Sequence, residues 1–203
     1  MVNSKERQSL HSSPLAWDTY SEIRTEQLRQ KTVLKPDFVQ VSQWKYILRQ
    51  CIENNCNPYL IIAIGVHETG WGALGWGRKG FILGVGCFSE TNADWSFQGF
   101  EKQVSWAASQ LGKFFGLHPT ASELQTFASK IWRPGDPDSW ASSVYQIFQK
   151  TQRQYGPEFS SFVDIPFYVT SDLLFLFDKG FLNTPFGSSD FYRTCSLLVR
   201  IYK

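Results

Sequence analysis

One stretch of the sequence, His67-Glu68-Thr69-Gly70-Trp71-Gly72, places an acid where an apolar helix must end. Leu60, Ile64 and Glu68 are spaced by four, so they share one helical stripe, and the first two point to the core. Burial and the carbonyl end of the helix dipole both disfavour a carboxylate there, which favours the neutral acid. A neutral carboxylic acid can protonate a glycosidic oxygen. The pattern therefore predicts Glu68 as a general acid.

His67-Glu68 also matches the first two residues of the zinc-protease signature H-E-x-x-H. That signature needs a second histidine four residues after the first, but Trp71 stands there and an indole cannot bind zinc. The four cysteines (Cys51, Cys56, Cys87 and Cys195) have no metal-binding spacing and are expected to be free thiols. We therefore expect neither a metal nor another cofactor.

Glycosidases usually need a second carboxylate, as a base or a nucleophile. Glu90, Asp94 and Glu101 are the candidates, and Glu101 already has a structural explanation at a helix start. We predict Glu90 as the second catalytic residue. Assistance by the substrate's acetamido group, or a transglycosylase reaction that needs no second carboxylate, stays open.

Tryptophans near Glu68 could stack on sugar rings. Trp71 adjoins the acid, Trp76 lies in a glycine-rich loop and Trp132 precedes a turn, so these three are the predicted platforms. Trp44 and Trp140 lie on apolar helical faces and are assigned to packing.

Apolar periodicity and capping residues predict the elements that position these groups. Helices are expected from Val41 to about Asn54, from Pro58 to about Gly70 and over 100–115. Two more should follow Thr120, which forms a capping box with Glu123, and the turn 133–137. Residues 70–99 hold more than half of the 15 glycines and should form a loop or small hairpin. The predicted fold class is all-α.

Three parts are expected along the chain: an arm over 1–36, the helical domain over 37–156 and an extension of unknown role over 157–203.

With 42% hydrophobic and 19% charged residues the composition is globular, and the net charge of +2 argues against a nucleic-acid partner. No segment is long enough to span a membrane, and the amino terminus does not resemble a signal peptide. We expect synthesis in the cytoplasm and action at the cell wall, reached as part of a virion or by a non-classical route.

Several segments together resemble the glucosaminidase domains of glycoside hydrolase family 73, related to endo-β-N-acetylglucosaminidases that act on glycoproteins. The lysozyme-like superfamily around them includes lytic transglycosylases and phage tail lysins. The resemblance covers about residues 41–150. It is carried by Asn57-Pro58-Tyr59-Leu60, by 67–72, by Ile82-Leu83-Gly84-Val85-Gly86-Cys87 and by 132–137 with Trp140-Ala141.

The resemblance implies a lysozyme-like fold and cleavage of the β-1,4 linkage beside N-acetylglucosamine in peptidoglycan, with Glu68 as the proton donor. It also implies a substrate contact at Gly84. Trp132 stands where the family often has a tyrosine linked to activity, and an indole offers no hydroxyl. The alternatives are a lytic transglycosylase and a non-catalytic peptidoglycan-binding module that keeps the fold. Glycoprotein chitobiose cores contain the same type of bond as the proposed substrate.

Overall fold

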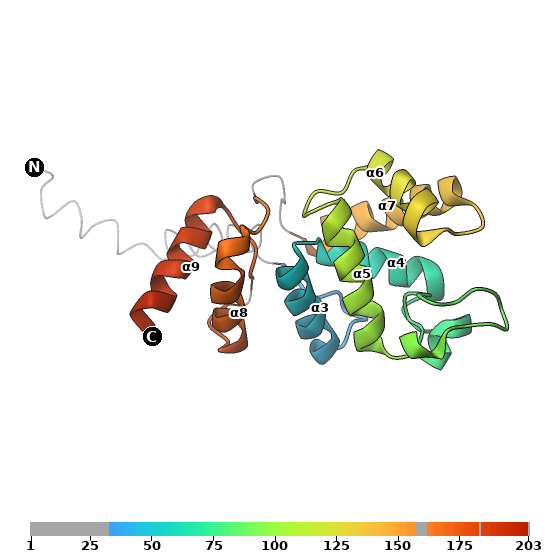
Figure 1. Ribbon diagram of the computed structural model, residues 1–203, viewed down its shortest axis with the longest axis horizontal. Coiled ribbons are helices and arrows are strands. Elements are labelled where there is room, and N and C mark those ends of the chain that lie inside the picture. Colours follow the sequence, from blue (N-terminus) through green and yellow to red (C-terminus); the bar gives the residue numbers. More distant parts are fainter. Residues whose placement is uncertain (1–32, 157–161, 183, 203) are drawn as a thin grey trace, which may run out of the picture.

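The computed structural model describes residues 33–156, 162–182 and 184–202. These ranges contain seven α-helices and no β-strand, which confirms the all-α class (Figure 1). The helices are α3 (Val41–Asn54), α4 (Pro58–Thr69), α5 (Phe100–Phe114), α6 (Ala121–Phe127), α7 (Pro137–Tyr155), α8 (Thr170–Asp178) and α9 (Ser189–Tyr202). None of the described helices is both long and apolar enough to cross a membrane.

Local capping sets the bounds of the first two helices. Asn55 takes a left-handed conformation (φ 52°) and ends α3. The Asn57 side chain accepts a hydrogen bond from the backbone N–H of Tyr59, and Pro58 occupies the first turn of α4. Gly70 (φ 56°) ends α4 in the left-handed region that favours glycine. The predicted bounds of both helices are confirmed.

Helix α4 is the centre of the domain, because every residue of its first two turns, 58–65, is buried. It packs against α7 and also contacts α3 and α5 (Figure 1). A helix that is apolar all round must be enclosed by other elements. The last turn of α4, which carries Glu68, directly follows these buried turns, so its position is fixed by the packing of residues 58–65.

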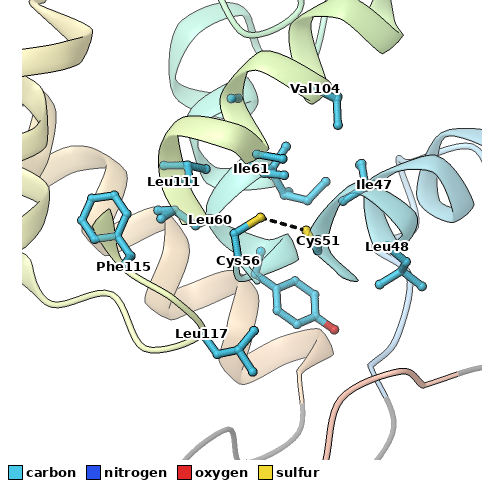
Figure 2. Close-up of a cluster of buried hydrophobic side chains, with 14 of the residues drawn as sticks. Ile47, Leu48, Cys51, Cys56, Leu60, Ile61, Val104, Leu111, Phe115 and Leu117 are labelled. Atoms are coloured by element: carbon cyan, nitrogen blue, oxygen red, sulfur yellow. Dashed lines mark hydrogen bonds between the residues drawn. The ribbon is translucent and has the colours of Figure 1, made fainter. Parts of the chain in front are cut away.

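Figure 2 shows the part of the core where α3, α4 and α5 meet. Cys51 lies on the buried face of α3 and Cys56 precedes α4, and their Sγ atoms are 3.3 Å apart. Both side chains are fully buried free thiols. Burial raises the pKa of the Cys51 thiol well above its ordinary value, so this thiol is neutral, and both side chains pack as part of the core.

The segment before α7 contains an irregular turn. The capping box of Thr120 and Glu123 is present at the start of α6. After Phe127 the backbone widens into a π-helical turn, Ala128–Trp132, which ends at Arg133 with a φ of 53°. Asp136 then caps α7 by accepting a hydrogen bond from the backbone N–H of Ser139. This turn orients Trp132 toward α4.

The glycine-rich segment between α4 and α5 is a compact loop. It contains two short 3₁₀ turns, Gly75–Lys79 and Trp95–Phe97, and one antiparallel bridge between Cys87 and Ala93. The buried Gln103 side chain of α5 holds this loop in place. Its Oε1 accepts from the backbone N–H groups of Leu83 (3.2 Å) and Val85 (3.0 Å), and its Nε2 donates to the carbonyls of Val85 and Phe97.

The flanks of the predicted domain pack onto it. Residues 33–36, assigned to the arm, contact the domain: Val33 is buried and the Leu34 N–H donates to the Tyr155 carbonyl. The rest of the predicted arm, 1–32, lies outside the described residues. In the extension, α8 and α9 lie side by side, and α8 packs against α3 (Figure 1). Arg49 of α3 binds both carboxylate oxygens of Asp178 at 2.7 Å.

Candidate active site

Glu68 lies in the last turn of α4 and is half-buried. Leu60 and Ile64, the earlier members of its stripe, are fully buried, as their spacing predicts. His67 is exposed, and its ring meets the Trp140 ring edge to face at 6.0 Å. The acid therefore lies where the buried helix reaches the surface.

Two tryptophans bind one oxygen of this carboxyl group. The indole N–H of Trp132 donates to Glu68 Oε1 at 2.8 Å, and the N–H of Trp140 donates to the same oxygen at 2.6 Å. An indole nitrogen can only donate. Oε1 must therefore be an acceptor in both bonds, and a proton on this carboxyl group has to reside on Oε2.

The second oxygen of Glu68 faces the backbone at Gly84. A Cβ built on Gly84 would lie 3.0 Å from Oε2, and the φ of Gly84 is +70°. Both the close approach and the left-handed backbone favour glycine at this position. Gly84 thus leaves open the space beside the oxygen that can carry the proton.

A surface groove of about 480 Å³ begins at this glycine. We call it the Gly84 groove; its lining residues are Gly84, Val85, Gly86, Cys87, Phe88, Phe97, Trp106, Ile131, Trp132 and Arg133. Burial, followed by the nearby charge of Glu68, raises the pKa of the Cys87 thiol to about 11. Cys87 is thus a neutral thiol at physiological pH and a poor nucleophile.

A larger cavity of about 720 Å³ lies between α3 and the turn after α8. Its walls come from residues 33–35, from α3 and from 177–182, and they are mainly apolar. The Gly84 groove shares Gly84 and Trp132 with the surroundings of Glu68, whereas the larger cavity is built from other elements. We therefore place the candidate site at the Gly84 groove.

Thr69, the residue after Glu68, connects the end of α4 to the glycine-rich loop through contacts with Gly72 and Gly77. The Thr69 hydroxyl donates to the Ile82 carbonyl at 2.6 Å and accepts from the Gly72 N–H at 2.9 Å. A Cβ on Gly77 would approach the Thr69 side chain to 2.6 Å. The end of α4 is thereby joined to the loop that carries Gly84.

The structure places the other two predicted tryptophan platforms away from the Gly84 groove. The Trp71 ring covers Gly65 of α4, where a Cβ would lie 2.7 Å from it, and meets Phe38 and Phe100 edge to face. Its indole nitrogen is buried without a hydrogen-bond partner. Trp71 therefore packs against the helix.

Trp76 belongs to an aromatic cluster of the loop. Its ring meets those of Phe81 (5.4 Å) and Trp95 (5.8 Å), and its indole N–H donates to the Ser89 carbonyl at 2.7 Å. The ammonium of Lys79 lies 4.1 Å from the ring centroid. These contacts give Trp76 a role in holding the loop.

The three candidate second carboxylates occupy different positions. Glu90 is exposed in the turn closed by hydrogen bonds from the N–H groups of Phe88 and Ser89 to the Asn92 carbonyl. Asp94 caps a 3₁₀ turn by accepting a hydrogen bond from the Ser96 N–H at 2.9 Å. The Ser96 side chain, followed by this backbone N–H, lowers the pKa of Asp94. Glu101 is exposed in the first turn of α5. Of the three, Glu90 is nearest in sequence to the groove, two residues after Phe88.

Sequence reasoning missed the role of Trp140 and of Gln103. Periodicity assigns Trp140 to packing, and the residue is buried at 4% exposure, but its polar edge also holds Glu68. The sequence does offer one signal. Trp132 and Trp140 stand on either side of the turn 133–137, and in the structure the π turn and the start of α7 bring both side chains to Glu68 of α4. No local pattern in the sequence indicates the loop contacts of Gln103.

Comparison of the chain with known protein families, with curated protein sequences and with solved structures finds no match. The residues and their geometry therefore carry the functional interpretation.

Proposed function

We propose that this protein is a glycoside hydrolase of the lysozyme-like glucosaminidase kind, cleaving the β-1,4 linkage beside N-acetylglucosamine in peptidoglycan. The observation that carries the proposal is the arrangement of Glu68, with one oxygen held by two indole N–H groups and the other beside Gly84 at the groove. The resemblance of residues 41–150 to glycoside hydrolase family 73 supports the same assignment.

In this proposal Glu68 is the general acid. With Oε1 occupied by two donors, the proton resides on Oε2 and is delivered to a glycosidic oxygen lying over Gly84. The leaving sugar departs as its alcohol, and Glu68 becomes a carboxylate. The two indole N–H groups then stabilise that charge, because hydrogen bonds to an ionised group are stronger than those to a neutral one.

Glu90 is the proposed second carboxylate, which would activate water from the loop after Phe88. A lytic transglycosylase is the second candidate, favoured by the exposed position of Glu90 at the loop turn. In that reaction a hydroxyl of the substrate itself attacks the anomeric carbon, and no second carboxylate is required. The two candidates share Glu68 and differ in their products.

The experiment that tests the proposal uses the full chain and purified peptidoglycan sacculi. The wild type should release soluble fragments, and Glu68→Gln should lower the rate of release by at least about a hundredfold. The amide oxygen introduced by this substitution can accept both indole hydrogen bonds, so the fold should be kept. Glu101→Gln, at an exposed helical position, is the matched control and should retain activity.

Mass spectrometry of the fragments distinguishes the candidates. Reducing N-acetylglucosamine ends, with loss of activity in Glu90→Gln, support the hydrolase. Anhydro ends, with Glu90→Gln fully active, support the transglycosylase. Sedimentation of the wild type with sacculi without any new ends contradicts both candidates and leaves the binding module. Full activity of Glu68→Gln contradicts the role of Glu68 as the general acid in both candidates.

A further inference from the structure

Arg133 is held in a fixed position at the far side of the Gly84 groove. It follows Trp132 directly, and its backbone N–H donates to the Ala128 carbonyl at 2.7 Å, closing the π turn. Its φ of 53° is unusual for a residue with a side chain. The same short turn therefore orients the indole that binds Glu68 and places Arg133 at the wall of the groove.

Among the residues that the structure describes, no carboxylate forms an ion pair with Arg133. Its Nε donates to the Lys130 carbonyl at 3.2 Å, which uses one of five guanidinium hydrogens. Within residues 33–156, 162–182 and 184–202, the ion pairs of arginine involve Arg49 and Arg193. The opposite wall, 84–88, consists of glycine, valine, cysteine and phenylalanine. The end of the groove near Arg133 is thus positive.

We propose that Arg133 is a specificity-determining residue that selects glycans bearing a carboxylate on the sugar next to the cleaved bond. This inference rests on the proposed function. With the glycosidic oxygen over Gly84, the next ring lies along the groove toward Trp132 and Arg133. A guanidinium binds a carboxylate through two parallel hydrogen bonds. The lactyl group of muramic acid carries such a carboxylate where no stem peptide is attached to it, whereas chitin-type chains carry none.

The test compares two peptide-free peptidoglycan strands of equal length. One keeps the free lactyl carboxylate, and in the other it is converted to a methylamide. A chitin oligosaccharide serves as a third, neutral substrate. Each is titrated by calorimetry against wild type, Arg133→Gln, Arg133→Lys and Arg153→Gln. Arg153 is the matched control, since it is an exposed helical arginine whose Nε also donates to a backbone carbonyl (3.3 Å) outside the groove.

The wild type should bind the free-carboxylate strand about two- to fivefold more tightly than the methylamide, the range expected for a solvent-exposed ion pair. Arg133→Gln should remove this preference, Arg133→Lys should keep part of it, and Arg153→Gln should keep all of it. High salt should reduce the preference. Equal affinity of the wild type for both strands, or an unchanged preference in Arg133→Gln, overturns the inference.

Failure of the inference and failure of the proposed function give different results. Cleavage of any of the three substrates that depends on Glu68 supports the function, whatever the preference between strands. A carboxylate preference that depends on Arg133, without cleavage, supports the inference about recognition and contradicts the hydrolase.

Discussion

The indole rings of Trp132 and Trp140 lie 5.6 Å apart at 30° to each other, and both direct their N–H groups at Oε1 of Glu68. The two residues come from different elements, the π turn after α6 and the first turns of α7. A single carboxyl oxygen thus fixes the relative position of three elements. Conversely, the orientation of the acid depends on two donors that can be removed one at a time.

Replacing either tryptophan by phenylalanine keeps a ring and removes one donor. For each variant we expect kcat to fall about ten- to a hundredfold, because the carboxyl group loses part of its orientation. Trp140→Phe should leave KM nearly unchanged, since Trp140 is buried, whereas Trp132→Phe should also raise KM because Trp132 lines the groove. The double variant should lose less than the product of the single losses. Full kcat in either single variant would contradict this role.

Gly84→Ala should block the space beside Oε2. Its new Cβ would lie 3.0 Å from that oxygen, at a backbone φ of +70°. We expect a loss of stability of about 1–2 kcal/mol from backbone strain, and a loss of activity larger than this destabilisation explains. Gly75→Ala is the control, because Gly75 has a φ of +47° and open space around its Cβ position. Similar activity losses in the two variants would argue against a role for the Gly84 approach.

Trp71→Phe should destabilise the protein less than Trp140→Phe. The Trp71 indole nitrogen is buried without a partner, and removing an unpaired donor offsets part of the lost packing. The Trp140 nitrogen makes a hydrogen bond of 2.6 Å, which the substitution breaks. Urea unfolding should show a difference in unfolding free energy of about 1–2 kcal/mol between the variants. An equal or larger cost for Trp71→Phe would refute this prediction.

Gln103→Met should loosen the loop that carries Gly84. The substitution keeps the length of the side chain but leaves the N–H groups of Leu83 and Val85 without their acceptor. We expect the unfolding free energy to fall by about 2–4 kcal/mol and hydrogen exchange to increase at both amides. Gln110→Met, at a half-buried position of the same helix, should cost less than about 1 kcal/mol. Unchanged exchange at Leu83 and Val85 would contradict the role of Gln103.

The stability of the protein should fall in alkali through Cys195 of α9. Burial, with a smaller effect of the Asp172 charge, raises the pKa of this thiol to about 11 from its ordinary value of 9.0. Below pH 9 the thiol is protonated in both states, and its contribution to stability is complete. Between pH 9 and 11 the unfolded chain loses the proton first, so stability decreases. Between pH 9 and 11 the unfolding free energy measured with urea should decrease less steeply in Cys195→Ala than in the wild type, and an identical slope would contradict this assignment.

The helices around the site could be predicted because their signals are local. Asn57 with Pro58, and Thr120 with Glu123, are capping patterns within four residues, and the structure confirms them. The glycine-rich loop could not be traced in detail, since its conformation depends on contacts with Gln103 from another helix. Glycine content indicates that a chain can turn, but not in which direction.

The tryptophans show a second limit of sequence reasoning. Periodicity places Trp140 on the buried face of α7 but does not show which polar group its N–H reaches. Trp71 stands close to Glu68 in sequence, yet the left-handed turn at φ 57° directs it over Gly65. In the extension, α9 buries Tyr192, Cys195 and Val199, which are spaced by three and four residues, so this part of the sequence does carry a helical pattern.

The hydroxyl of Tyr59 determines how short a working fragment of this chain can be. It lies 2.9 Å from the Leu34 carbonyl and 2.6 Å from the Tyr155 carbonyl, with one proton to share between them. A fragment that begins after residue 36 lacks the Leu34 carbonyl, and a fragment that ends before residue 155 lacks the Tyr155 carbonyl. Either fragment would expose a tyrosine that is otherwise fully buried. Expression fragments should therefore start no later than Val33, eight residues before α3 begins at Val41, and should include Tyr155 at the end of α7.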